Sequence, residues 1–186
     1  SLAEIEIICI DAGSTDGTVE MLKEYASCDN RIKFINFGVK SYGAQVNYGI
    51  SISQGQYIGI LETDDFIAPD MYETLYQTAS AYDADYVKAD YKKFFAMKNG
   101  EYLYSVIKLF EKENIRFYGK LLNPHTFDYL YQTDFNIWKG IYKKDFLIQN
   151  QIRLNESNGA SYQDIGFMEK VMAWSKRAVY LDKPFY

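Results

Sequence analysis

Cysteine, histidine and long apolar runs are all scarce in this chain. Its 186 residues include two cysteines and one histidine. Cys9 lies in a predicted strand and Cys28 near a predicted helix end, and the pair forms no metal-binding or redox motif. We therefore expect two reduced thiols and a cytoplasmic protein. No apolar run approaches the roughly 20 residues that cross a bilayer, and no basic segment followed by an apolar one opens the chain as in a secretory signal.

Positive charge is also in the minority. Lysine and arginine number 20 against 25 aspartates and glutamates, which gives a net charge of -5. This balance disfavours a mainly electrostatic partner such as nucleic acid or an anionic membrane. A hydrophobic fraction of 48% with 24% charged residues is typical of an ordered protein. The length suits one domain, and we expect a single domain over residues 1–186.

Aromatic residues, in contrast, are abundant, with 18 tyrosines and 12 phenylalanines. A tyrosine ring is apolar and its hydroxyl is polar, so tyrosine suits surfaces that hold sugars, nucleobases or protein partners. A slightly polar core uses the same residue, and we expect most of these rings to lie in the core.

Apolar runs and turn residues alternate regularly in the first half of the chain. Strands are expected at 4–10, 31–37, 56–62 and 84–95. Helices are expected at 18–26, at 43–52 and after Pro69, where Met71, Leu75, Ala79 and Tyr82 recur at helical spacing. This alternation predicts an α/β fold with a largely parallel sheet.

The second half is less regular. Residues 96–135 predict a hairpin followed by loops and short helices, and 136–150 a strand followed by a short helix. A helix with Ile165, Met168 and Met172 on one face and a final strand near 178–186 complete the chain. We expect this half to cover one end of the first sheet.

Two acidic turns follow predicted strands, at 11–16 and at 62–65. Ligands of parallel α/β sheets bind outside the carboxyl ends of the strands, where these turns lie. Each turn by itself is as compatible with a purely structural role as with a binding site: the first could be a turn with a helix cap, and the second a solvated loop with a capping aspartate. Together they suggest a Mg²⁺ or Mn²⁺ site, because such cations take oxygen ligands and share phosphate oxygens.

Four segments in register resemble glycosyltransferase family 2. They read IEIICIDAGSTDGTVEMLKEYA, QYIGILETDDFIAPDMYETLY, IWKGIYKKDFL and YQDIGFMEK. The resemblance implies an α/β GT-A fold, a Rossmann-like and mostly parallel sheet flanked by helices, with the first strand of the family missing. It also implies a metal-dependent enzyme that inverts the anomeric centre of a nucleotide-sugar.

The resemblance further implies roles for individual residues. Nucleotide-sugar binding falls to the residues at the two acidic turns and to one aromatic: Asp11, Gly13, Ser14, Asp16, Glu62, Thr63, Asp64 and Trp138. Asp64 and Glu62 match the metal-binding positions, although Glu62 stands where aspartate is usual. Ala12 replaces a second acid that contacts the base, which puts the preference for uridine in doubt.

The catalytic base of inverting members lies in an acidic pair before a helix, here Gln163-Asp164. Asp164 is therefore the implied base, which accepts the proton of the acceptor hydroxyl. The alternative is that Asp164 only caps the helix, where a carboxylate also favours the helix dipole. Lys139, Lys143 and Lys144 are expected on a solvated face, with Lys139 near enough to Trp138 in sequence to reach a phosphate.

The implied function is transfer of a sugar, from a UDP-sugar by preference, to a glycan or lipid-linked acceptor in cell-surface polysaccharide synthesis. Residues 1–95 would bind the donor and 96–186 would face the acceptor. Nucleic acid is not expected as a partner. The chain is expected to be a fragment, with peripheral membrane association through absent regions and an exposed strand edge that favours a homodimer.

Two other functions remain open at this stage. Ala12, Glu62 and Gln163 depart from the family pattern, which is compatible with a catalytically inactive module that binds nucleotide or glycan. A sugar-phosphate nucleotidyltransferase shares a similar α/β base, but the glycine-rich signature with a basic residue that it needs is not visible.

Overall fold

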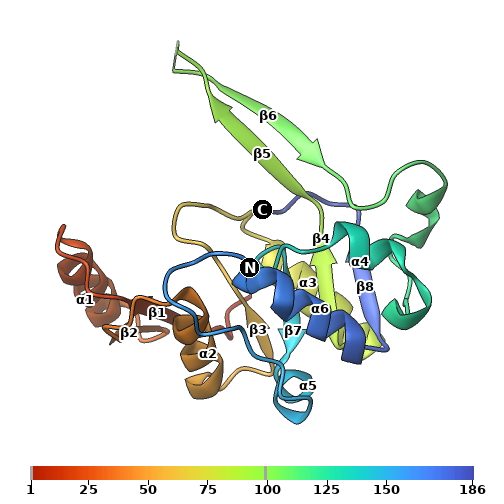
Figure 1. The fold of residues 1–186 in the computed structure, drawn as a ribbon. Coiled ribbons are helices and arrows are strands. Elements are labelled where there is room, and N and C mark those ends of the chain that lie inside the picture. The colour runs from red at the N-terminus through yellow and green to blue at the C-terminus, as the bar shows by residue number, and fades with distance from the viewer. Residues whose placement is uncertain (1, 99) are drawn as a thin grey trace.

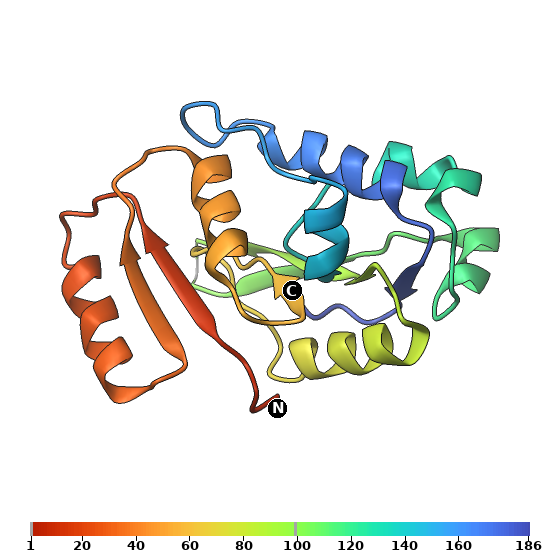
Figure 2. The same ribbon diagram turned by 90° about the horizontal axis from the view of Figure 1, so that it is seen from below.

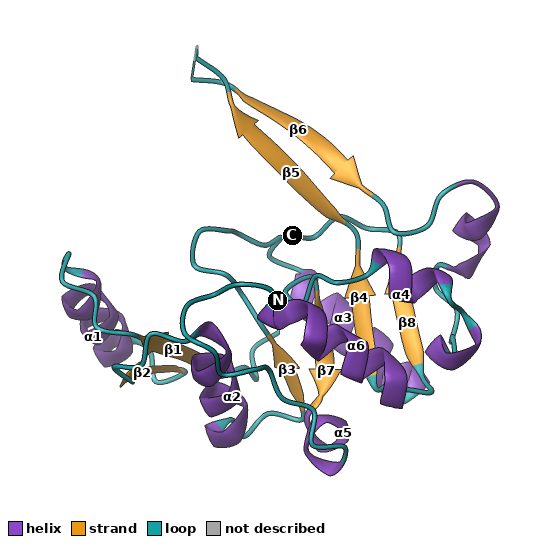
Figure 3. Cartoon of the chain, in the orientation of Figure 1, coloured by secondary structure: helices purple, strands orange, loops and turns teal. Residues whose placement is uncertain are grey.

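The computed structural model describes residues 2–98 and 100–186 (Figure 3). Its strands are β1 (Ile7–Asp11), β2 (Ile32–Asn36), β3 (Tyr57–Gly59), β4 (Tyr86–Ala89), β5 (Tyr91–Ala96), β6 (Tyr102–Ile107), β7 (Gly140–Lys143) and β8 (Ala178–Leu181). Its α-helices are α1 (Thr18–Cys28), α2 (Tyr42–Ile52), α3 (Met71–Tyr82), α4 (Tyr129–Thr133), α5 (Lys144–Gln149) and α6 (Gln163–Trp174). Two 3₁₀ turns, η1 (Lys112–Phe117) and η2 (Pro124–Thr126), lie between β6 and α4.

The central sheet has the strand order β3-β7-β4-β8 (Figure 1). β4 and β8 are parallel, and β7 pairs antiparallel with both β3 and β4. The sheet is therefore mixed, and the predicted parallel direction holds for β3, β4 and β8. β7 is reversed because the segment before it returns the chain to the end where β4 finishes.

Only glycine fits at Gly140, at the start of β7, where a Cβ would lie 2.4 Å from the carbonyl oxygen of Val87.

Helices cover both faces of this sheet (Figure 2). α3 lies on one face, where its predicted apolar positions Met71, Leu75 and Ala79 are fully buried against Val87 and Val179. α6 covers the other face through its own buried apolar residues, among them Met168 and Met172. Side chains on both faces of β4 are therefore covered by helices, which explains why all four of its residues are buried.

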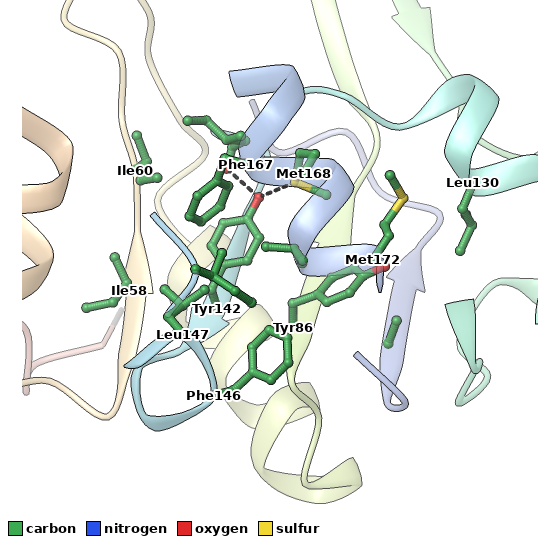
Figure 4. Packing of buried hydrophobic residues seen from close by; sticks show 14 of the residues in the cluster. Ile58, Ile60, Tyr86, Leu130, Tyr142, Phe146, Leu147, Phe167, Met168 and Met172 are labelled. Carbon is green, nitrogen blue, oxygen red and sulfur yellow. Dashed lines mark hydrogen bonds between the residues drawn. The ribbon is translucent and has the colours of Figure 1, made fainter. Parts of the chain in front are cut away.

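Tyrosine rings fill much of the core under α6 (Figure 4). Tyr142 donates its hydroxyl to the carbonyl of Ile137 at 2.8 Å and lies 3.3 Å from the sulfur of Met168. The hydroxyl groups of Tyr86 and Tyr180 form a hydrogen bond of 2.9 Å with each other. Each buried phenol has a hydrogen-bond partner, as a buried polar group requires. These rings confirm that part of the tyrosine excess belongs to the core.

The predicted strand 84–95 is wrong as a single element. It breaks at Asp90, whose carboxylate accepts the amide of Leu109 at 3.0 Å and the hydroxyl of Tyr118 at 2.7 Å. β4 stays in the sheet, while β5 leaves it and pairs with β6 as a separate hairpin. These hydrogen bonds fix the point at which the chain turns out of the sheet.

β1 and β2 form a parallel pair apart from the central sheet. The apolar run of β1 predicted a strand buried on both faces, but Ile7 is exposed and the middle residues are only partly buried. Among the described residues β1 has a strand partner on one edge only, which accounts for this exposure.

None of the helices in the described part of the chain has both the length and the apolar character needed to cross a membrane.

Candidate active site

A small hollow opens where β3 ends and β7 begins. The antiparallel register ends with Gly59 paired to Ile141, so the segment that leaves β3 toward Glu62 and the segment that enters β7 from Trp138 start from the same end of the sheet. The hollow has a volume of about 120 Å³ and is lined by Tyr42, Glu62, Trp138, Ala160, Gln163 and Asp164. Three predicted site residues, Glu62, Trp138 and Asp164, therefore meet here although they are distant in the sequence.

Tyr42 and Glu62 form a hydrogen bond across this hollow. The Tyr42 hydroxyl, from the first turn of α2, donates to Glu62 Oε1 at 2.5 Å. Burial raises the pKa of Tyr42 well above its ordinary value, and the hydrogen bond to Glu62 and the charge of Asp164 raise it further. The phenol therefore stays protonated and keeps Glu62 in place.

Four carboxylates gather around this point. Burial raises the pKa of Glu62, the negative charges of Asp64, Asp65 and Asp164 add to the effect, and the Tyr42 hydrogen bond opposes it. No lysine or arginine in the described residues forms an ion pair with any of the four. Among the described residues, none of the four is therefore neutralised by a direct ion pair, although the charge of Asp164 does act on the buried ammonium of Lys88, whose pKa it raises.

This donor set fits a magnesium or manganese ion. No group of three histidine, cysteine or acidic residues in the described part of the chain could hold a metal ion alone. Asp64 is exposed in the 62–65 turn, and only one oxygen of Glu62 is used by Tyr42. One or two carboxylates are what Mg²⁺ takes from a protein when phosphates and waters supply its other ligands.

Asp164 stands in the first turn of α6 and faces the hollow. It forms no hydrogen bond or ion pair with the described residues, and α6 has no side-chain cap. The capping alternative therefore lacks its hydrogen bond, although the carboxylate still lies near the positive end of the helix dipole. A partly buried carboxylate without a partner is available to accept a proton.

Gln163, which replaces an acid of the family pattern, is buried and fully hydrogen-bonded. Its Oε1 accepts the amide of Gly43 at 2.8 Å, and its Nε2 donates to the carbonyl and hydroxyl oxygens of Ser157, both at 2.7 Å. A glutamate could make the first bond but has no N–H for the other two. Gln163 thus joins the starts of α2 and α6 and positions the neighbouring Asp164.

The turn after β1 is satisfied by its own atoms. Asp11 accepts the amides of Gly13 and Ser14 at 2.7 and 2.9 Å and the Ser14 hydroxyl at 2.5 Å, which lowers its pKa. Asp16 accepts the hydroxyl and amide of Thr18 at the start of α1. Gly13 has φ +97°, a conformation that favours glycine. Among the described residues, no hydrogen bond or ion pair joins this turn to the carboxylates of the hollow.

Trp138 lies between two tyrosines at the edge of the hollow. It stacks on Tyr186 at 4.2 Å and meets the edge of Tyr91 at 4.8 Å. The Tyr186 hydroxyl accepts the amide of Glu62 at 3.1 Å, which ties this aromatic group to the acidic turn. One face of Trp138 is therefore covered by Tyr186, while the ring also lines the hollow.

Thr63, another predicted site residue, lies with Asp64 in the exposed turn.

The expectation that Lys139 lies on a solvated face is wrong. Its ammonium is buried 3.1 Å from Asp134, which also accepts Lys88 at 2.6 Å and the Tyr180 hydroxyl at 2.8 Å. Lys139 therefore cannot reach a bound phosphate in this conformation. Lys143, at the end of β7, does lie at the surface, where it pairs with Asp83.

A larger hollow, of about 380 Å³, lies at the opposite end of the sheet beside Trp174. Three basic residues, Lys143, Lys176 and Arg177, line it beside two acids, and part of its polar groups are already partnered: Asp85 accepts the amides of Lys176 and Arg177, and Lys143 pairs with Asp83. The smaller hollow is therefore the better candidate, because no basic residue lines it and its two acids, Glu62 and Asp164, form no ion pair with the described residues.

Sequence reasoning missed Tyr42, Ala160 and Tyr186 as parts of the site. Tyr42 follows the serine that caps α2, and no spacing distinguishes it from the other tyrosines. Tyr186 lies 124 residues from Glu62, so only the fold reveals their contact.

Comparison with known proteins decides the family. The family described as Glycosyl transferase family 2 matches residues 1–144, which include Asp11, Glu62, Asp64 and Trp138 but not Asp164. The chain belongs to this family. It is similar over 98% of its length to the glycosyltransferase GlyG of Streptococcus pneumoniae, with 30% identity over 60% of that protein. An uncharacterized glycosyltransferase of Escherichia coli, YibD, is 29% identical over 98% of this chain and 52% of its own length.

Solved structures agree with this family on the fold. TarS 1-349 of S. aureus superposes with a TM-score of 0.73 at 18% identity, covering 98% of this chain and 50% of TarS 1-349. The same protein in complex with UDP-GlcNAc also gives 0.73. The fold class is thus an α/β GT-A fold with a mixed sheet. The chain spans about half the length of these relatives.

Proposed function

We propose that this chain is the glycosyltransferase domain of a protein that moves a sugar from a nucleotide diphosphate to an acceptor hydroxyl with inversion. The observation that carries this proposal is that Glu62 and Asp164 line one hollow, that the charges of Asp64 and Asp65 also raise the pKa of Glu62, and that none of these four acids forms an ion pair with the described residues. We take UDP as the nucleotide, which the UDP-GlcNAc complex of TarS supports. Residues 1–186 would form one domain, with 1–95 on the donor side and 96–186 on the acceptor side.

Asp164 would act as the base. It would take the proton of the acceptor hydroxyl while that oxygen forms a bond to the anomeric carbon. The bond from this carbon to the diphosphate would break, and the nucleotide diphosphate would leave with the electron pair. Gln163 would hold Asp164 in position, and Tyr42 would orient Glu62.

Asp64 and the free oxygen of Glu62 would hold Mg²⁺ or Mn²⁺. When bound, the ion would neutralise charge on the departing diphosphate. The turn of Asp11, Gly13, Ser14 and Asp16 would receive the nucleoside. For the finer setting we propose a glycan or lipid-linked acceptor in cell-surface polysaccharide synthesis, in the cytoplasm and with peripheral membrane association.

An inactive binding module is the second candidate. The hydrogen bonds that Asp11 accepts within its own turn favour it, because they leave little of this carboxylate for a base contact. Such a module would bind nucleotide without turning it over.

The release of UDP from UDP-sugars in the presence of Mn²⁺ tests these alternatives in the full-length protein. We expect slow release that Asp164→Asn and Asp64→Ala each reduce by at least about 100-fold. Asp145→Asn, an exposed acid at the other end of the sheet, is the matched control and should leave the rate unchanged. UDP binding without release from any donor would favour the inactive module.

A further inference from the structure

The β5–β6 hairpin stands away from the body of the molecule (Figure 1). In the described part of the chain its strands, Tyr91–Ala96 and Tyr102–Ile107, pair only with each other as a two-stranded sheet. A lone hairpin is marginally stable in water, yet this one exposes large apolar side chains. They include Phe95 at 57%, Leu103 at 60% and Tyr102 at 56% exposure.

The strand register places these side chains on both faces of the hairpin. Phe94 lies opposite Tyr104, with ring centroids 6.5 Å apart, and Tyr102 lies 5.7 Å from Phe94 on the same face. Phe95 lies opposite Leu103 on the other face, because successive residues of a strand alternate. An exposed apolar patch of this kind marks an interaction surface, and here it extends around the hairpin.

The hairpin is also basic within an acidic chain. Residues 91–108 contain four lysines and one glutamate, whereas the whole chain has a net charge of -5. Lys92, Lys93 and Lys98 are exposed and form no ion pair with the described residues. The overall charge disfavours a mainly electrostatic membrane partner, but this segment has the opposite sign.

Apolar side chains on both faces together with exposed lysines favour one kind of partner for the hairpin. A glycan would stack on the aromatic rings of one face and would leave the aliphatic side chains of Leu103 and Met97 exposed to water. A second copy would cover one face or one edge and would meet the same lysines. A lipid surface accepts apolar side chains on all sides of a projecting element, and anionic head groups complement the lysines.

We propose that the β5–β6 hairpin is a membrane contact that inserts at the head-group level of an anionic bilayer. The apolar side chains would reach the boundary of the acyl chains, and the lysines and Glu101 would remain among the head groups. Phe66, in the loop after the 62–65 turn, packs on Phe94 at 5.4 Å. The bilayer would thus lie beside the candidate active site. This binding does not depend on the proposed transfer reaction.

Flotation with vesicles tests the proposal. We expect the protein to bind vesicles of equal parts phosphatidylcholine and phosphatidylglycerol, and not phosphatidylcholine alone. Replacing Lys92, Lys93 and Lys98 together by glutamine should weaken binding about 100-fold, since each lysine near an anionic surface contributes about fivefold. Phe95→Ser with Leu103→Ser should weaken it about 10-fold. Raising the salt concentration should weaken it as well.

Matched variants on other surfaces serve as controls. Met21→Ser with Tyr25→Ser removes two side chains of α1 that are each 58% exposed, and Lys23, Lys40 and Lys120 to glutamine removes three exposed charges. Both should bind like the wild type, as should Asp164→Asn, which separates this proposal from the catalytic one. A tryptophan placed by Leu103→Trp should shift its emission to the blue on the anionic vesicles only.

Three results would overturn the proposal. The first is no vesicle binding at all, and the second is vesicle binding that the hairpin and control variants reduce equally. The third is a dimer in vesicle-free solution that Phe95→Ser with Leu103→Ser dissociates, because a second copy would then cover the hairpin. Thermal unfolding of each variant verifies that these surface changes leave the fold intact.

Discussion

The hydroxyl of Tyr42 lies 2.5 Å from Oε1 of Glu62 and joins the first turn of α2 to the loop that follows β3. This bond holds a half-buried carboxylate whose other neighbours, Asp64, Asp65 and Asp164, are all negatively charged. It uses one oxygen of Glu62 and leaves the second for a ligand. The hydrogen bond thereby fixes the orientation of the Glu62 side chain, which is one methylene longer than the aspartate usual at this position in the family.

Tyr42→Phe should reduce kcat/KM for release of UDP from a UDP-sugar by about 10-fold or more. A hydrogen bond to a charged group contributes about 1.5–3 kcal/mol, and without it Glu62 is free to rotate. Tyr48→Phe is the matched control, since Tyr48 lies on the same helix and stacks on Phe37 through its ring. Equal rates for Tyr42→Phe and the wild type would contradict this role of the bond.

Glu62→Gln should stabilise the metal-free protein at neutral pH. The raised pKa means that the folded protein disfavours the Glu62 carboxylate more than the unfolded protein does. Ionisation therefore removes stability from the wild type as the pH rises above the ordinary glutamate value of about 4.5. In urea unfolding the advantage of Glu62→Gln should be absent below that pH and grow above it, whereas a loss of stability at every pH would refute the argument. Glu169→Gln, exposed on α6, is the matched control and should change the free energy of unfolding at neutral pH by less than about 0.5 kcal/mol.

Gln163→Glu restores the acid of the family pattern and should nevertheless destabilise the protein. The carboxylate loses the bond to the carbonyl of Ser157 and faces that oxygen, while the Ser157 hydroxyl can still donate to it, so the cost should be about 1–3 kcal/mol in the free energy of unfolding. Gln77→Glu, exposed on α3, should change it by less than about 0.5 kcal/mol. A variant Gln163→Glu as stable as the wild type would show that the Ser157 contacts contribute nothing.

Asp134→Asn should be far more damaging than Lys88→Met. Asp134 is the shared partner of two buried ammonium groups, so its loss leaves both unpaired and should cost about 3–5 kcal/mol. Lys88→Met leaves Asp134 paired with Lys139 and Tyr180, and should cost less than about 1 kcal/mol. Urea unfolding of the two variants measures the difference, and equal losses would contradict the shared-partner arrangement.

The stability of the wild type should rise with pH above neutrality. Burial lowers the pKa of Lys88 to about 7 against the opposing charge of Asp134, while an unfolded lysine keeps its proton up to about 10.5. Between these values the unfolded protein binds more protons, so the free energy of unfolding increases with pH. Lys88→Met should lack this increase. A flat wild-type profile from pH 7 to 9 would contradict the lowered pKa.

Local patterns in the sequence were sufficient for much of the fold. The spacing of Met71, Leu75 and Ala79 predicted α3, and all three are buried as expected. The order of strands and helices predicted the α/β class, and four motifs in register predicted the family. These features depend on neighbours in the chain, which is why they can be read without the structure.

Features that depend on distant contacts could not be predicted in this way. The strand at 84–95 breaks because Asp90 meets Leu109 and Tyr118. Lys139 is buried because Asp134, from an irregular segment, lies beside it. The sequence did bring Glu62, Asp64 and Asp164 together through a resemblance, but it gave no sign that Tyr42 and Gln163 would hold two of them in place.

A crystal structure of the protein with UDP and Mn²⁺ tests the central claim most directly. We expect the ion to bind Asp64 and diphosphate oxygens, with the diphosphate directed into the hollow that Tyr42, Trp138 and Asp164 line. Density for UDP in the larger hollow beside Trp174, or a manganese ion that none of the acids at 62, 64, 65 and 164 contacts, would contradict it.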